Sequence, residues 1–130
     1  MTSALYASLA AVLIVWLSLQ VINVRRAKKI SLGDGNDDEL KTVMAAQENA
    51  LNYVPITLLL LFALEYNNGY LIVVHVFGLL FMLGRVIHAR AILASNLDKR
   101  VLGMQITFFV IIGLAIANLV ALPYFRFYIF

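Results

Sequence analysis

The pattern of apolar and polar positions divides the chain into four long apolar stretches separated by short polar segments. In the first stretch, Ala4 to Val24, the apolar run is interrupted only by Ser8, Ser18, Gln20 and Asn23. Its length matches the roughly 20 residues that a helix needs to cross a bilayer. Nothing basic precedes Arg25, as it would in a cleaved signal peptide, so we expect this stretch to stay in the protein as a membrane helix.

Three polar segments predict where the helices end and begin. Ser31 to Glu39 is dense in glycine, asparagine and aspartate, Asn67 to Gly69 is a shorter break, and Ser95 to Asp98 is the third. Such residues mark turns, and acidic residues suit the first turn of a helix. The pattern therefore predicts an all-α integral membrane four-helix bundle, a single domain over residues 1–130, with helices at approximately 4–28, 38–66, 70–94 and 99–122.

Single residues refine the expected helices. Pro55 falls inside the second one, where membrane helices tolerate proline because neighbouring groups satisfy the freed carbonyl. Either Asp98 or Asn96 is expected to cap the fourth helix, and Pro123 is expected to end it. Tyr124 to Tyr128 is rich in aromatic residues, which is typical of an anchor at the membrane–water interface.

Basic residues gather around two of the three expected connections. The first connection is flanked by Arg25, Arg26, Lys28, Lys29 and Lys41. The third is approached or flanked by Arg85, Arg90, Lys99 and Arg100. The residues before the first helix and the Asn67–Gly69 turn carry no lysine or arginine. By the positive-inside rule, the first and third connections face the cytoplasm and both termini lie outside it.

Composition narrows the class of protein. The chain is 63% hydrophobic and 13% charged, whereas soluble domains are roughly a quarter charged. With Cys 0 it has no disulfide, no thiolate nucleophile and no cysteine metal ligand. His75 and His88 fall on different faces of the third expected helix, so no metal site is expected. A net charge of +3 gives no reason to expect nucleic acid as a partner.

Polar side chains interrupt the first half of the second apolar stretch. Helical spacing places four residues on one side of this helix: Ala45, Asn49, Asn52 and Tyr53. Polar groups are costly in hydrocarbon, so this side is expected to face protein, water or a ligand.

Two arginines and a histidine are the candidates for chemistry. Arg85 and His88 lie one turn apart on the third expected helix, and an arginine several residues inside a membrane helix is a candidate functional residue. Alternatively, Arg85 reaches the lipid headgroups or forms a structural ion pair with Glu48. Arg100, at the start of the fourth helix, is either a topological anchor or a charge that stabilises a thiolate or an oxyanion.

Several short motifs follow one another over nearly the whole chain: Val24-Arg25-Arg26, Leu32-Gly33-Asp34-Gly35, Asn49-x-x-x-Tyr53-Val54-Pro55, Gly84-Arg85-x-x-His88 and Arg100-x-x-Gly103. Their order and spacing resemble the MAPEG family, the membrane-associated proteins in eicosanoid and glutathione metabolism, which include the microsomal glutathione transferases. The Gly-Asp-Gly turn is typical of the bacterial branch. The resemblance implies a homotrimer of four-helix protomers in the bacterial inner membrane, with glutathione bound between subunits near the cytoplasmic face.

The resemblance also implies roles for individual residues. Arg100 matches the arginine that stabilises the glutathione thiolate, and is the expected catalytic residue. The residues expected to bind glutathione are Arg26, Gln47, Asn49, Asn52, Tyr53, Arg85 and His88. Two positions depart from the usual family pattern, because Ala45 replaces an arginine and Asn52 a glutamate, and Ile92 stands where some relatives have a tyrosine. Each lost charge removes charge-assisted hydrogen bonds worth roughly 1.5–3 kcal/mol.

Two functions stay open at this point. The first is a glutathione transferase-like enzyme that uses glutathione as co-substrate against lipophilic electrophiles or lipid hydroperoxides. The second is a non-catalytic membrane scaffold or lipid-binding protein with a weakened glutathione site, motivated by Ala45 and Asn52. The expected partners are further copies of the chain, glutathione, and lipophilic small molecules or lipids. A proton-coupled transporter is disfavoured because the first helix has no acidic residue.

Overall fold

The computed structural model describes residues 1–67 and 69–122 as a bundle of long helices. They are α1 (Ser3–Lys28), α2 (Asp38–Tyr66), α3 (Leu71–Leu93) and α4 (Leu97–Ala121). Each is long and apolar enough to cross a membrane, which confirms the predicted all-α membrane bundle. Pro123 and the predicted aromatic anchor Tyr124–Tyr128 lie outside the described residues.

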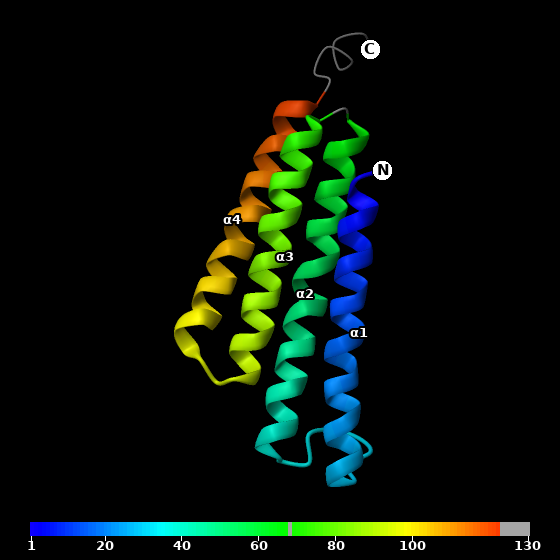
Figure 1. Ribbon diagram of the computed structural model, residues 1–130, viewed down its shortest axis with the longest axis vertical. Coiled ribbons are helices and arrows are strands. Elements are labelled where there is room, and N and C mark those ends of the chain that lie inside the picture. Colours follow the sequence, from blue (N-terminus) through cyan, green and yellow to red (C-terminus); the bar gives the residue numbers. More distant parts are fainter. Residues whose placement is uncertain (68, 123–130) are drawn as a thin grey trace.

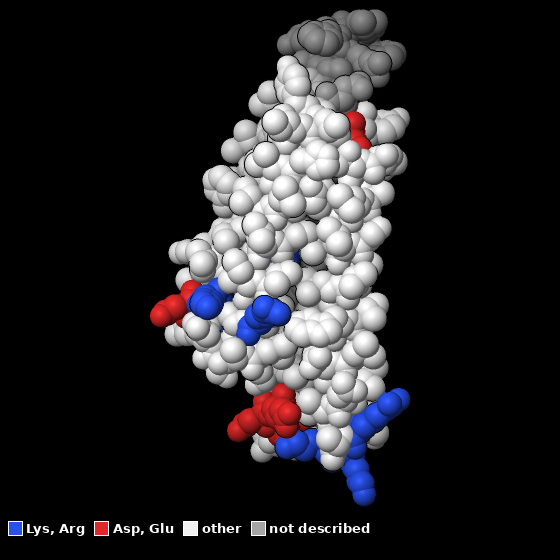
Figure 2. Space-filling view, in the orientation of Figure 1, with Lys and Arg blue, Asp and Glu red and all other residues white. Residues whose placement is uncertain are grey.

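Consecutive helices run in opposite directions, and each packs against the next (Figure 1). In addition, α2 contacts α4 and α1 contacts α3. The N-terminus, the α2–α3 connection and the end of α4 lie at one end, here named the terminal end. The α1–α2 loop and the α3–α4 turn lie toward the other end, here named the basic end because Lys and Arg gather there (Figure 2).

Short polar side chains cap the two helices that begin at the basic end. Asp37 accepts a hydrogen bond from the Leu40 N–H at 2.9 Å, and Asn96 accepts one from the Lys99 N–H at 3.1 Å. Each bond satisfies a donor that the first helical turn would otherwise leave unpaired. Of the two expected caps for α4, the structure uses Asn96, so the helix begins at Leu97 rather than at Lys99.

Left-handed residues let the α1–α2 loop turn back sharply. Gly33, Gly35 and Asn36 have φ angles of 67°, 56° and 54°, a conformation that glycine adopts without strain. Arg25 closes the loop by donating to the carbonyl oxygens of Gly33 at 2.8 Å and of Ile30 at 3.3 Å. This arginine therefore holds the loop in place.

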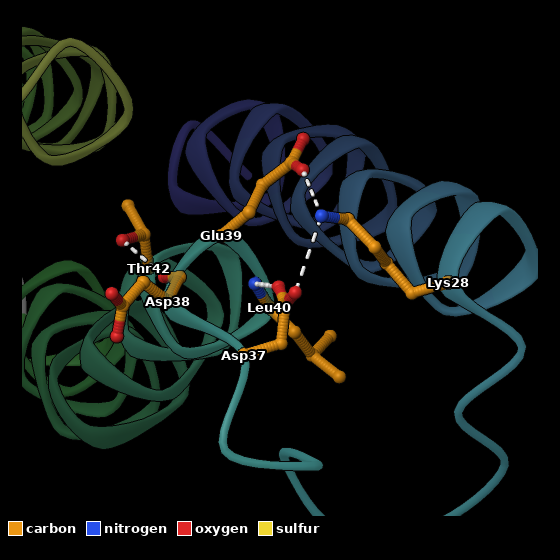
Figure 3. Close-up of polar contacts among 6 residues, drawn as sticks. All are labelled: Lys28, Asp37, Asp38, Glu39, Leu40 and Thr42. Atoms are coloured by element: carbon orange, nitrogen blue, oxygen red, sulfur yellow. Dashed lines mark hydrogen bonds and ion pairs between the residues drawn. The ribbon is translucent and has the colours of Figure 1, made fainter.

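An exposed ion-pair network joins the end of α1 to the start of α2 (Figure 3). Lys28 Nζ lies 3.2 Å from a carboxylate oxygen of Asp37 and 3.4 Å from one of Glu39. The Leu40 N–H and the Lys28 ammonium lower the pKa of Asp37 below its ordinary value of 3.8. Because Lys28 and Glu39 are exposed and Asp37 is only half-buried, solvent screens these charges and the network contributes little to stability.

Helices α3 and α4 approach closely because glycines lie where they meet. A Cβ on Gly103 would lie 2.7 Å from the Cβ of His88 and 2.9 Å from the carbonyl oxygen of Gly84. A Cβ on Gly84 would lie 2.8 Å from Cγ2 of Ile106. Such short contacts would force the helices apart in a close-packed interior. The glycines therefore fix how α3 and α4 present their neighbouring side chains.

Polar groups at the terminal end tie α2 and α3 to the start of α1. The Glu65 carboxylate accepts hydrogen bonds from the Thr2 N–H, from the Ser3 N–H at 2.8 Å and from the Ser3 hydroxyl. One turn further, the hydroxyl of the buried Tyr6 lies within hydrogen-bond distance of His75, 2.8 Å from Nδ1. We name these five residues the terminal cluster.

Candidate functional site

Arg85 on α3 is a charged side chain inside the bundle, with only 2% of its surface exposed. Its Nη1 donates a 2.7 Å hydrogen bond to Asn49 Oδ1 on α2, and its Nη2 lies 3.8 Å from the Met104 sulfur on α4. Its Nε–H has no hydrogen-bond partner in the part of the chain that the structure describes. The guanidinium therefore links three helices while using only part of its donor capacity.

An aromatic ring and a thioether complete the surroundings of Arg85. Its Cζ atom lies 5.9 Å from the ring centroid of Tyr53, whose ring meets that of Phe108 edge-on at 5.6 Å between centroids. Asn49 Nδ2 lies 3.6 Å from the sulfur of Met104, to which it donates. We name Asn49, Tyr53, Arg85 and Met104 the Arg85 cluster.

The Arg85 cluster holds a cation without an opposite charge. Across residues 1–67 and 69–122, the ion pairs are those of Lys28, and the expected alternative partner Glu48 is exposed. The amide oxygen and the sulfur that Arg85 contacts are neutral acceptors, and sulfur is a weak one. A buried guanidinium without an opposite charge is destabilising. Arg85 therefore lacks the opposite charge that an anion such as a carboxylate would supply.

The glycine contact between α3 and α4 brings the parts of the site together. Arg85 directly follows Gly84, and Met104 directly follows Gly103, so the close approach of the glycines places the guanidinium beside the sulfur. His88, one turn after Arg85, is 2% exposed and packs against Gly103. Three helices thus position Arg85, its partners and His88 within one region of the bundle.

Arg100 lies at the basic end of this region, one turn before Gly103. It is exposed, and it lines a cavity of about 250 Å³ together with Thr42 of α2 and Ser95 and Asn96 of the α3–α4 turn. No hydrogen bond between described residues joins it to the Arg85 cluster. Arg100 is therefore near the cluster along α4 but outside it.

Arg26 and Gln47, both predicted glutathione ligands, lie away from the Arg85 cluster. Gln47 faces α1, where its Nε2 donates a 2.9 Å hydrogen bond to the Ser18 hydroxyl. Arg26 is exposed near the end of α1 and lines a surface hollow with Lys29 and Ser31. A single chain therefore does not assemble all of the predicted residues.

The predicted polar side of α2 has two different surroundings in the folded bundle. Asn49 and Tyr53 contact groups of α3 and α4, whereas Asn52 and Glu48 are exposed. Successive helical residues differ by about 100°, so Asn52 and Tyr53 point in different directions although both are neighbours of Asn49. Helices α3 and α4 cover only the sector that contains Tyr53.

Met104 and Phe108 belong to the site but were not predicted. Met104 is an acceptor for both Arg85 and Asn49, and Phe108 packs on the aromatic ring of the cluster. They follow Arg100 at intervals of four, on one face of α4. This spacing is the one signal that indicates them, and in a largely apolar helix it does not distinguish them from lipid-facing residues.

Comparison with known proteins agrees with this architecture. The model of the MAPEG family matches residues 3–120, nearly the whole chain. Two curated relatives, the inner membrane protein YecN of Escherichia coli K12 and the protein of the same name from Escherichia coli O6:H1, are each 32% identical over 124 residues. These matches cover 95% of both chains. The extent of the matches and the bundle of apolar helices confirm the resemblance: the chain belongs to the MAPEG family.

Proposed function

We propose that this protein is an integral inner-membrane protein that binds glutathione and uses its thiolate to attack lipophilic electrophiles. The names of the two relatives, both inner membrane proteins, support the location. The main support for the glutathione proposal is Arg85, a buried guanidinium that is positioned by Asn49 and Tyr53 and whose Nε–H has no partner among the described residues.

Glutathione supplies the negative charge that Arg85 lacks. The peptide carries two carboxylates, and a guanidinium can donate two parallel hydrogen bonds to one carboxylate. The 2.7 Å bond to Asn49 and the ring of Tyr53 hold the guanidinium in a defined orientation before a ligand arrives. A carboxylate bound here would neutralise the buried cation and anchor the peptide.

Arg100 lies toward the basic end from this anchor and is the group proposed to act on the thiol, whereas His88 is proposed to help bind the peptide. A guanidinium stays charged at ordinary pH, and a nearby positive charge favours the thiolate over the thiol. In the reaction, the thiolate sulfur forms a bond to the electrophilic carbon, and the electron pair of the broken bond departs with the leaving group.

The exposed polar residues of α2 support an assembly, which we propose to be a homotrimer. Glu48 and Asn52 are exposed within a helix long and apolar enough to span the membrane, where lipid chains would be costly neighbours. A second copy packed on this face of α2 would shield them from lipid. By the positive-inside rule, the basic end faces the cytoplasm and both termini lie outside it.

The test is a calorimetric titration of glutathione into the detergent-purified full-length protein, combined with an ultraviolet difference spectrum for the thiolate. We expect saturable binding and a thiolate band. Arg100→Ala should keep binding but lose the band, because the thiol then has its ordinary pKa. An undiminished band in this variant would contradict the role of Arg100, and no binding at millimolar glutathione would contradict the proposal as a whole.

The second candidate function is a non-catalytic scaffold or lipid-binding protein that no longer holds glutathione. Ala45 and Asn52 favour it, because neutral side chains stand where the family has an arginine and a glutamate. The double variant Ala45→Arg with Asn52→Glu separates the two functions. A gain in glutathione affinity of about tenfold or more would mean that the native site has weakened, whereas no gain would favour the enzyme.

A further inference from the structure

The exposed face of α3 is apolar over most of its length. Exposed residues recur there at spacings of three or four and form one stripe: Ile72, Val76, Leu79, Leu83 and Val86. Such a stripe, on a helix long enough to cross a membrane, suits contact with lipid chains. It leads to Arg90, which is exposed in the last turn of α3. Arg90 therefore lies where the lipid-facing stripe meets the basic end.

Beside Arg90, α3 and α4 separate toward their turn (Figure 1), and a groove of about 450 Å³ lies between them. Its lining is mostly apolar, with three polar side chains near the turn: the apolar residues are Val86, Ile87, Ala91, Ala94 and Leu102, and the polar ones are Arg90, Asn96 and Lys99. The groove thus combines a wall for a hydrocarbon chain with a basic group on each of the two helices.

The two basic side chains of the groove have no polar partner among the described side chains. Between described residues, neither Arg90 nor Lys99 forms an ion pair or a side-chain hydrogen bond. Asp98, in the first turn of α4, is not part of the lining, and Arg100 lines the separate cavity beside Thr42. The lining therefore carries two positive charges and no negative one.

We infer that this groove is a binding site for an anionic phospholipid. The lipid phosphate would accept hydrogen bonds from Arg90 and Lys99, and an acyl chain would lie along Val86 and Leu102, continuous with the lipid-facing stripe. The apolar wall favours a lipid over a soluble anion, which would leave that wall without a partner. The site shares no residue with the Arg85 cluster and does not depend on glutathione.

Native mass spectrometry of the full-length protein in detergent tests the inference, with phosphatidylglycerol and phosphatidylcholine of the same acyl chains as probes. We expect preferential retention of phosphatidylglycerol. The double variant Arg90→Gln with Lys99→Gln should weaken its retention about thirtyfold, from two basic groups that act on one anionic lipid. As a matched control, Lys29→Gln with Lys41→Gln removes the same charge near the α1–α2 loop and should retain the lipid as the wild type does.

Several outcomes would overturn the inference. Equal retention of the two lipids, or equal losses in the two double variants, would mean a general attraction of anionic lipid to the basic end. Displacement of phosphatidylglycerol by an equimolar amount of inorganic phosphate would mean a soluble-anion site. Leu102→Asn leaves the charge unchanged and should also weaken retention, so an unaffected Leu102→Asn variant would contradict the proposed acyl-chain contact.

Discussion

The terminal cluster and the Arg85 cluster are both polar groups within an apolar bundle, but they differ in how far they are satisfied. The Glu65 carboxylate accepts three hydrogen bonds from the first residues of α1, where the helix dipole also favours a negative charge. Arg85 contacts one amide oxygen and one sulfur, and its Nε–H has no partner among the described residues.

This difference separates a structural role from a binding role. A buried polar group with all of its hydrogen bonds helps to specify the fold, whereas a buried cation with only neutral partners is destabilising. We therefore interpret the terminal cluster as structural and the Arg85 cluster as a ligand-binding position. Stability measurements on both clusters test this distinction.

The largest effect on stability is expected at the terminal end. Glu65→Ala leaves the N–H groups of Thr2 and Ser3 without their acceptor, which should lower the free energy of unfolding by about 2–3 kcal/mol. Titration of the purified protein with sodium dodecyl sulfate measures this value. Glutathione affinity of the folded variant should stay unchanged, and a specific loss of affinity would contradict the structural role of Glu65.

A smaller effect is expected at Arg85. In Arg85→Met, removal of a poorly paired buried charge offsets the lost hydrogen bond to Asn49, so the free energy of unfolding should change by about 1 kcal/mol or less. If Arg85 instead served mainly to hold the bundle together, the loss would be about 3–5 kcal/mol. Arg90→Met, an exposed arginine on the same helix, is the control for the same detergent titration.

The smallest effect on stability is expected in the ion-pair network of Lys28 at the basic end, where solvent screens the charges. The Leu40 N–H and Lys28 lower the pKa of Asp37 from 3.8, so its contribution to stability is present above that value and is lost as the pH falls through the lower folded value. We expect a shallow loss of thermal stability below about pH 4 in the wild type, and a weaker one in Asp37→Asn. Identical acid sensitivity of the two proteins would contradict this.

The bundle and three of the four residues of the Arg85 cluster could be predicted from the sequence. Apolar stretches of membrane-spanning length predict the helices. Asn49, Tyr53 and Arg85 were indicated because polar groups inside a membrane need partners. Met104 could not be predicted, because nothing in an apolar side chain tells which neighbour its sulfur meets. The exposure of Asn52 could not be predicted either, because it depends on which sector of α2 the other helices cover.

Glu65 illustrates the same limit at the terminal end. A glutamate near the end of a membrane helix is expected to be solvated, and neither its spacing nor its neighbours indicate a partner. Its three hydrogen bonds arise because α1 begins beside the end of α2, which is a property of the packed bundle.

The central claim, that Arg85 binds the ligand, is tested most directly by calorimetric titration of glutathione into the wild type, Arg85→Met and Arg90→Met. The two variants compare a buried arginine with an exposed one on α3. We predict wild-type affinity for Arg90→Met and a loss of about a hundredfold for Arg85→Met, because truncating a buried charge partner costs about 2–5 kcal/mol. Equal affinity in all three proteins would contradict the claim.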